Sequence, residues 1–248
     1  MRLSIIVCAN RDNPFFCEAL DSLAAARDGM GDVETVLIAN GGWNPPAEIT
    51  ERFDKVINLA EAGLGRARNE GVRQASSKWI TFFDADDALD RAYIKETLKV
   101  IATCDVTREI VFNVVVMTDE KGTPFDDGFR LERLPDRIST IIAHPFTGAT
   151  LVIGRETFIA AGGYDWQGYA EDYELTLRLM GAPHNLRIVR NPQSIYLYRQ
   201  HADTMSGSSI RKIEGVRDVQ LHHARTGNPL MYFGVMISRL RLLKERFS

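Results

Sequence analysis

The feature that most constrains the fold of this chain is a repeated alternation of short apolar runs with segments of helical periodicity. Apolar runs rich in Ile, Val and Phe cover residues 3–9, 33–39, 56–59 and 79–83. Unbroken runs of this length are typical of strands buried on both faces, as in a parallel sheet. Between the first two runs, Phe16, Ala19 and Leu23 recur at helical spacing. The rhythm predicts βαβ units and an α/β fold, with a mostly parallel central sheet flanked by helices.

The second half of the chain is less regular. Its patterns predict strands over 110–117, 149–153, 188–189 and 194–198, and helices over 93–101, 155–161 and 171–180. From residue 210 onward the chain is expected to be helical, with a break at Gly227-Asn228-Pro229. Because no linker or internal repeat is evident, we expect one α/β domain over residues 1–206. Residues 207–248 would form a C-terminal helical extension packed on it.

Charge, hydropathy and cysteine spacing exclude several classes of protein. The 33 acidic and 30 basic residues give a net charge of −3, which argues against a general nucleic-acid binder. The sequence holds no apolar run of about 18 residues, and polar residues follow the first short apolar run too early for a signal peptide. Cys8, Cys17 and Cys104 are odd in number and lack zinc-site spacing. These features favour a soluble protein in a reducing compartment, most simply the cytoplasm.

The sharpest motif is an acidic cluster that follows the fourth apolar run, in WITFFDADDALD. The strand would deliver Asp84 and Asp86 to the carboxyl edge of a parallel sheet, where open α/β sheets bind ligands. Carboxylates at this density suit Mg²⁺ or Mn²⁺, especially a metal that also holds diphosphate oxygens. The alternative is a solvated turn in which Asp87 or Asp90 caps the next helix.

An ordered set of motifs around this cluster resembles the inverting GT-A glycosyltransferases of family 2. The set runs from residue 3 to about 206: SIIVCAN, ANGGW, GLGRARNEG, FFDADD, GATLVIGRETFIAAGGYD, AEDYELTLRL and YRQH. The resemblance implies a GT-A fold, which is Rossmann-like. It also implies a nucleotide-diphosphate-sugar donor, a divalent metal, and direct displacement at the anomeric carbon.

The resemblance assigns donor and metal binding to particular residues. Those expected to bind the nucleotide sugar are Ala9, Asn10, Asn40, Arg68, Asp84, Ala85 and Asp86. Asp86 and His201 would hold the metal, which neutralises the diphosphate leaving group. This chain departs from the family at Asn40, where an aspartate is usual, and at Ala9 and Asn10 in the opening motif. An amide both donates and accepts hydrogen bonds, so Asn40 could still read a uracil base, and we favour UDP.

The pair Glu171-Asp172 resembles the family's E-D pair, which implies that Asp172 is the general base for the acceptor hydroxyl. A carboxylate at a helix N-terminus is stabilised as the anion, although the same acids could merely complement the helix dipole. Three nearby aromatic residues, Tyr164, Trp166 and Tyr169, could form an acceptor pocket or close the core.

Taken together, these features predict a metal-dependent, inverting glycosyltransferase of the hexosyltransferase type that uses Mg²⁺ or Mn²⁺. It would transfer a sugar from a UDP-sugar to a saccharide, lipid-linked or other hydroxyl acceptor. The alternatives are a non-catalytic nucleotide-sugar-binding module and a haloacid-dehalogenase-like phosphatase with Asp84 as nucleophile. The basic, apolar segment Leu230–Phe247 could pack on the domain, form a homodimer, or lie on the inner membrane face.

Overall fold

A single sheet of eight strands runs through a computed structural model of the chain, which describes residues 2–125, 140, 148–201 and 209–247. Residues 202–206, the last of the segment that resembles family 2, lie outside the described residues. The strands are β1 (Leu3–Ala9), β2 (Val33–Ala39), β3 (Lys55–Asn58), β4 (Trp79–Asp84), β5 (Ala88–Leu89), β6 (Glu109–Thr118), β7 (Leu151–Gly154) and β8 (Arg187–Arg199). The helices are α1 (Phe16–Arg27), α2 (Ala47–Thr50), α3 (Leu64–Gln74), α4 (Tyr93–Ile101), α6 (Arg155–Ala160), α7 (Glu171–Met180), α8 (Ser209–Thr226) and α9 (Met231–Phe247). A 3₁₀ turn, η1 (Gly148–Thr150), precedes β7.

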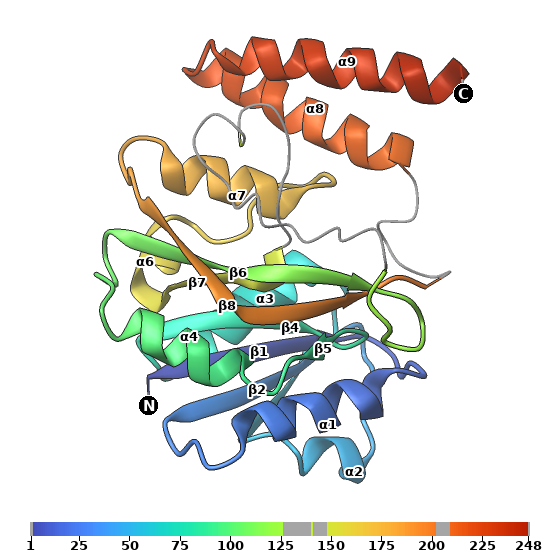
Figure 1. Cartoon of the computed structure of the whole chain (residues 1–248), viewed down its shortest axis with the longest axis vertical. Helices are drawn as coiled ribbons and strands as arrows, with labels where there is room; N and C mark the ends of the chain where they lie inside the picture. Colours follow the sequence, from blue (N-terminus) through green and yellow to red (C-terminus); the bar gives the residue numbers. More distant parts are fainter. Residues whose placement is uncertain (1, 126–139, 141–147, 202–208, 248) are drawn as a thin grey trace.

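The sheet has the order β3-β2-β1-β4-β7-β6-β8-β5. Neighbouring strands from β3 to β4 are parallel, as are β6 and β8, while β7 is antiparallel to both of its neighbours. The short β5 is antiparallel to β8. The predicted α/β architecture with a mostly parallel sheet and C-terminal helices is therefore confirmed (Figure 1).

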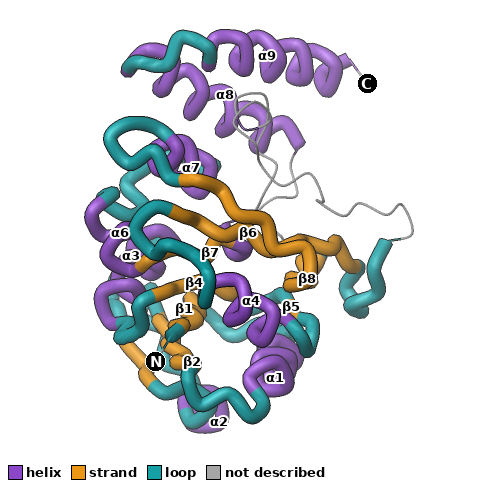
Figure 2. The backbone as a smooth tube through the Cα atoms, turned by 60° about the vertical axis from the view of Figure 1, so that its left-hand side comes forward, coloured by secondary structure: helices purple, strands orange, loops and turns teal. Residues whose placement is uncertain are grey.

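Helices cover both faces of the sheet, which explains why β1 and β2 are buried at almost every position. In β1, Ile6 faces the core shared with α3, α6 and α7, whereas Ile5 and Val7 face the core shared with α1, α2 and α4. Successive side chains of a strand point to opposite faces, so a strand covered on both sides has no solvent-facing position. Figure 2 shows α1 and α4 on one side of the strands and α3 and α6 on the other.

The predicted turn after β2 forms at Gly41 and Gly42, whose φ angles are +70° and +76°. Side chains disfavour this left-handed region, so glycine suits both positions. The turn carries the chain from the carboxyl end of β2 toward β3, and it leaves Asn40 at the sheet edge.

The prediction of two short strands over 188–189 and 194–198 was wrong in one respect, because both belong to β8. Its pairing with β6 jumps from Asn113–Asn191 to Val114–Ile195, so residues 192–194 bulge out of the ladder. Pro192 lies in this bulge and has no N–H to donate to a neighbouring strand. The interrupted hydropathy pattern therefore marks an irregularity within one strand.

The C-terminal helices stack on α7 at one end of the molecule (Figure 1). The Gln220 side chain of α8 lies 3.4 Å from the Tyr173 hydroxyl of α7 and accepts a hydrogen bond from Ser238 of α9 at 2.8 Å. Among the described residues, the helices are too short or too polar to cross a bilayer.

Candidate active site

The carboxyl ends of β1 and β4 lie side by side, with Cys8 paired to Asp84 in the sheet register. From β1 the chain continues to β2 on one side, and β4 is added on the other. This reversal of strand order is where open α/β sheets bind ligands. A cavity of about 610 Å³ lies here, bounded by the loop after β1, the turn after β4 and the end of β8.

Most of the residues predicted to bind the donor line this cavity. They are Ala9, Asn10, Asn40, Asp84, Ala85 and Asp86, joined by His201 at the end of β8. The loop after β1 contributes further lining residues, among them Arg11, Asn13 and Phe15. Segments far apart in the sequence thus enclose a single space, in the place that the motif order predicts.

Asp86 and His201, the two residues predicted to hold the metal, are in direct contact. The His201 Nε2 atom lies 2.9 Å from Asp86 Oδ2, and the imidazole ring packs against Phe15 with centroids 5.0 Å apart. A carboxylate oxygen and an imidazole nitrogen are donor types that fit Mn²⁺, and the carboxylate also suits Mg²⁺. Within the described part of the chain, no three His, Cys, Asp or Glu side chains cluster closely enough to enclose an ion. Among the described residues, Asp86 and His201 are the side chains that could hold a cation here.

A buried hydrogen-bond network, which the sequence analysis missed, holds the acidic turn (residues 84–87) in place. The Asp87 carboxylate accepts hydrogen bonds from the Tyr196 hydroxyl at 2.6 Å and from the Arg199 backbone N–H at 2.8 Å. Burial, together with the charges of Asp84 and Asp86, raises the pKa of Asp87 well above its ordinary value. The solvated, helix-capping interpretation of Asp87 was therefore wrong, since only 1% of the residue is exposed.

The Arg199 guanidinium completes this network. Its Nε donates to the Asp86 carbonyl at 3.0 Å, another N–H donates to the Glu120 carbonyl, and Nη2 pairs with Glu18 at 2.8 Å. The guanidinium also lies over the Phe15 ring, 4.7 Å from its centroid. The only sequence signal for this role was the position of Arg199 two residues before His201, because all these partners are distant along the chain.

Arg68 lies behind the cavity and joins the two acidic motifs. One guanidinium nitrogen donates to Asp84 Oδ1 at 2.8 Å, and the other lies 3.6 Å from Glu171. Burial alone would lower the pKa of Arg68, but Asp84 is the first of several neighbours that raise it well above the ordinary value. Arg68 is not among the described residues that line the cavity. It is linked to the cavity through its contact with Asp84, which does line it.

The N-terminus of α7 presents Asp172 beside this arginine. Asp172 Oδ2 accepts the Gly148 N–H at 2.8 Å, and Oδ1 accepts the Tyr173 N–H at 2.9 Å. A Cβ atom at position 148 would lie 2.9 Å from Asp172 Cβ and 3.4 Å from an Arg68 nitrogen. The close approach of η1 to α7 therefore requires glycine at this position.

Backbone strain accompanies this arrangement at Ala170, the residue before Glu171. Ala170 is buried and adopts φ +68° and ψ +41°, a left-handed conformation that residues with a Cβ atom rarely adopt. Strain of this kind is stored at functional sites, where the surrounding structure holds it in place. The outlier supports a functional role for the acids that follow it.

Asn40 lines the cavity, and its side chain makes hydrogen bonds to the protein backbone. Its Nδ2 donates to the Ala9 carbonyl at 3.0 Å, and its Oδ1 accepts the Gly63 N–H at 3.3 Å. The amide thus ties the end of β1 to the start of α3, which an aspartate could not do at the Ala9 carbonyl. Burial raises the pKa of the neighbouring Cys8 to about 12, so this thiol stays protonated at neutral pH.

The three aromatic residues before α7 do not act as one group. Tyr164 is buried in the core, with its ring 5.6 Å from Phe82 and 5.5 Å from Phe158 between centroids. Trp166 and Tyr169 are half-buried, and the indole N–H of Trp166 donates to the Tyr169 carbonyl. For Tyr164 the core interpretation is therefore the right one.

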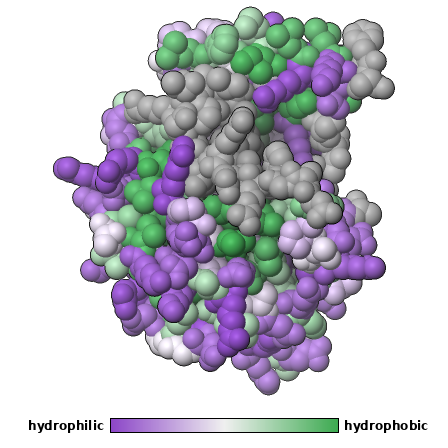
Figure 3. All heavy atoms as spheres, viewed as in Figure 1, coloured by the Kyte–Doolittle hydropathy of each residue, from purple (hydrophilic) through white to green (hydrophobic). Residues whose placement is uncertain are grey.

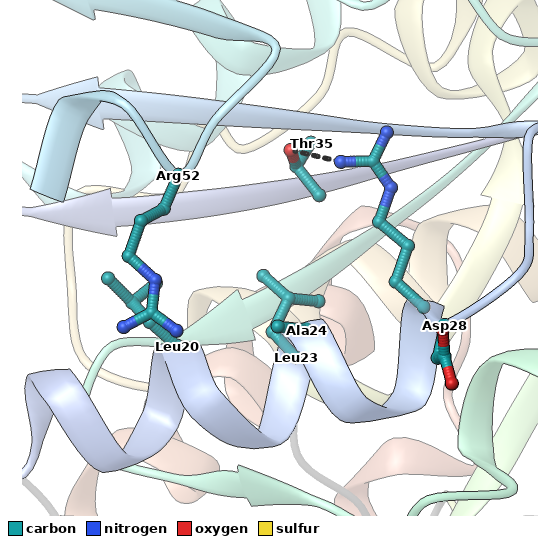
Figure 4. A pocket seen from close by; sticks show the side chains of 7 residues that line it. Leu20, Leu23, Ala24, Asp28, Thr35 and Arg52 are labelled. Atoms are coloured by element: carbon teal, nitrogen blue, oxygen red, sulfur yellow. Dashed lines mark hydrogen bonds between the residues drawn. The ribbon is translucent and has the colours of Figure 1, made fainter.

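A second cavity, of about 340 Å³, lies between α1, β2 and the end of α2 (Figure 4). Arg52 points toward Leu20 there, and the dashed line marks the hydrogen bond from Arg27 to Thr35. Both arginines are paired with carboxylates, Arg27 with Asp54 at 2.8 Å and Arg52 with Asp21 at 2.6 Å. This cavity has neither the acidic motif nor the sheet-edge position of the first.

The chain is similar to known glycosyltransferases. The family model of glycosyl transferase family 2 matches residues 4–155. The uncharacterized glycosyltransferase EpsJ of Bacillus subtilis is 36% identical over 96 residues, which cover 36% of this chain and 27% of EpsJ. The amylovoran biosynthesis glycosyltransferase AmsE of Erwinia amylovora is 31% identical over 130 residues, which cover 49% of this chain and 46% of AmsE. The chain thus spans between a quarter and a half of the length of these relatives.

Solved structures share the fold. TarS 1–349 of Staphylococcus aureus in complex with UDP-GlcNAc superposes with a TM-score of 0.64 at 18% identity, over 90% of this chain and 67% of that one. The mannosyltransferase PcManGT of Pyrobaculum calidifontis, in complex with GDP-Man and Mn²⁺, gives 0.65 at 16% identity, over 100% and 75%. These likenesses confirm the GT-A fold that the motifs imply.

A family match over more than half of the chain also sets aside the phosphatase alternative, whose D-x-D motif would follow the first strand of the domain rather than β4. The match, the fold and the order of the motifs around the cavity agree. The chain belongs to glycosyl transferase family 2.

Proposed function

We propose that the chain is a metal-dependent, inverting glycosyltransferase that transfers a sugar from a nucleotide-diphosphate donor to a hydroxyl acceptor. One observation carries this proposal above the others. The Arg68 side chain contacts Asp84 on the proposed donor side and Glu171 on the proposed acceptor side, and Gly148, whose N–H donates to Asp172, also lies close to this arginine. The contact of Asp84 and Glu171, 87 positions apart along the chain, with one arginine supports the proposal that the two acidic motifs belong to one site.

The donor occupies the cavity at the ends of β1 and β4 in this proposal. Asn10, Asn40 and Asp84 line this cavity and would offer polar groups to a base and a ribose, and the diphosphate would lie beside Asp86. The similar structures carry UDP-GlcNAc in one case and GDP-Man with Mn²⁺ in another. We favour a UDP-sugar.

A divalent cation, Mg²⁺ or Mn²⁺, would be held by Asp86 and His201. Bound there, it would neutralise charge on the leaving diphosphate. The chain's own contribution is to hold the two ligands: Arg199 binds the Asp86 carbonyl, and Phe15 packs on the imidazole. Arg199 and Phe15 thus position the two metal ligands and are not ligands themselves.

Asp172 is the proposed general base, with Glu171 beside it. The α7 N-terminus and the Gly148 N–H stabilise the Asp172 carboxylate as an anion, which keeps it able to accept the acceptor's hydroxyl proton. Glu171 pairs with Arg68 and so holds the start of the helix toward the donor. One base facing a departing diphosphate suits a single displacement with inversion.

The acceptor is proposed to be a saccharide, a lipid-linked compound or another molecule with a hydroxyl group. Residues 1–206 would carry the transferase activity and residues 207–248 would form an extension packed on that domain, in the cytoplasm. The packing of α8 on α7 through Glu174 and His223, 3.6 Å apart, supports this division.

The test is release of nucleoside diphosphate from a panel of UDP-, GDP-, dTDP- and CDP-sugars in the presence of Mn²⁺. Wild-type protein should release nucleotide from one donor class, and Asp172→Asn should lower the rate by about 10²–10⁴-fold while donor affinity is kept. Asp165→Asn changes an exposed acid in the preceding loop and serves as the control. Donor binding without release by the wild type would instead identify a non-catalytic binding module. An Asp172→Asn variant that reacts at the wild-type rate would contradict the assignment of the base.

A further inference from the structure

Helix α9 has apolar side chains on two faces, and α8 covers one of them. Met231, Val235 and Leu242 are buried, and Ser238 between them hydrogen-bonds Gln220 of α8. The other face is open. Its large apolar residues, which are between 49% and 67% exposed, are Leu230, Tyr232, Phe233, Met236, Leu240 and Leu243.

The open face is a continuous stripe with cations along its edges. At about 100° per residue, positions 233, 236, 240 and 243 fall on one side of the helix. The same geometry places Arg239 at one edge of the stripe and Lys244 at the other, with Arg241 further round the helix on the Lys244 side, and all three are exposed. Figure 3 shows hydrophobic residues gathered along the end of the molecule where α9 lies, with hydrophilic residues beside them. Exposed apolar patches with a polar rim mark interaction sites.

The charge of the stripe favours a lipid surface over a second copy of the chain. Pairing two stripes would bring Arg239, Arg241 and Lys244 of both copies together. A surface of anionic lipid instead attracts these cations and takes up the apolar side chains between them.

We propose that α9 docks the protein on anionic membrane surfaces, with Phe233, Met236, Leu240 and Leu243 inserted at the headgroup level. Helix α9 is the outermost element at one end of the long axis (Figure 1), so a flat surface can reach the whole stripe. The docking surface lies on elements separate from β1, β4 and β8, which form the donor cavity. The proposal therefore goes beyond the transferase activity and stands or falls independently of it.

The experiment is flotation of the full chain with vesicles of phosphatidylcholine alone or with 30% phosphatidylglycerol (a chosen composition, about one anionic lipid in three). Wild-type protein should float with the anionic vesicles and detach at high salt. Replacing Arg239, Arg241 and Lys244 by Gln should weaken partitioning by roughly 100-fold, since each cation near such a surface contributes about fivefold. The double variant Phe233→Ser/Leu240→Ser should lose vesicle binding while its melting temperature and UDP affinity remain those of the wild type. Ile159→Ser, a comparably exposed apolar residue on α6, is the matched control and should float like the wild type.

Three results would overturn the proposal. The first is equal binding of the wild type to both vesicle types, and the second is equal loss of binding in the Ile159→Ser control. The third is no vesicle binding by the wild type. If the wild type then also forms a concentration-dependent dimer that the Phe233→Ser/Leu240→Ser variant abolishes, the stripe is a contact between copies.

Discussion

Replacing Arg199 by Lys tests whether the buried guanidinium holds the acidic turn in place. The side chain is 1% exposed and makes hydrogen bonds to the Asp86 and Glu120 carbonyls and an ion pair with Glu18. A lysine keeps the charge but cannot reach all three partners, because its ammonium is a single point donor. Hydrogen bonds from charged donors contribute about 1.5–3 kcal/mol each, and the pair with the half-exposed Glu18 contributes at most about 1 kcal/mol. We therefore expect a loss of about 2–4 kcal/mol in the free energy of unfolding.

Urea denaturation measures this loss, and the melting temperature should fall by about 5–15 °C for a chain of this size. Arg2→Lys is the control, since Arg2 pairs with Asp32 at the surface and both side chains are more than half exposed. That variant should lie within about 0.5 kcal/mol of the wild type. The reasoning would be refuted if Arg199→Lys were as stable as Arg2→Lys. Weaker Mn²⁺ binding by Arg199→Lys would further connect the network to the position of Asp86.

Three further changes probe the supports of the site and of the sheet. Gly148→Ala should cost about 1–3 kcal/mol in urea denaturation, because its Cβ would lie 2.9 Å from that of Asp172. Ala170→Gly should raise the melting temperature, since glycine adopts φ +68° without strain worth about 1 kcal/mol, and an unchanged or lower value would argue against strain there. Glu34 is buried, and although burial opposes ionisation, bonds from Lys55, Ser4 and Ser76 lower its pKa from 4.5 to about 2. Because the folded state has the lower pKa, about 3 kcal/mol of stability is present above pH 5 and is lost as the pH falls toward 2. Glu34→Gln should flatten the unfolding free energy over that range, and a profile parallel to the wild type would contradict the assignment.

The parts of the fold that sequence reasoning predicted are those with a local signature. Strands buried on both faces, such as β1 and β4, leave an unbroken apolar run, and the helix over Glu171–Met180 leaves a 3.6-residue period. Asp84 and Asp86 were placed at the sheet edge because they directly follow such a run. Each of these inferences needs only neighbouring residues.

The supports of the site could not be predicted in this way. Arg199 and Tyr196 contact the acidic turn across more than 100 residues, and Arg68 contacts Glu171 across a similar distance. Local periodicity carries no information about which distant elements pair. The bulge in β8 likewise depends on its register with β6. The hydrogen bonds of Asn40 to Ala9 and Gly63 could not be predicted either, since they depend on loops that come together only in the fold.

The central claim is that the turn after β4 binds a nucleoside diphosphate together with a divalent cation held by Asp86. Calorimetric titration of UDP in Mn²⁺ and in EDTA, with wild type and Asp86→Ala, tests it most directly. Loss of a partner that merely orients a metal ligand lowers metal affinity by about 10–100-fold, so loss of the ligand itself should exceed about 100-fold. We expect tight UDP binding by the wild type in Mn²⁺ only, and weak binding by Asp86→Ala in both buffers. Equal UDP affinity for wild type in Mn²⁺ and in EDTA, matched by Asp86→Ala, would contradict the account.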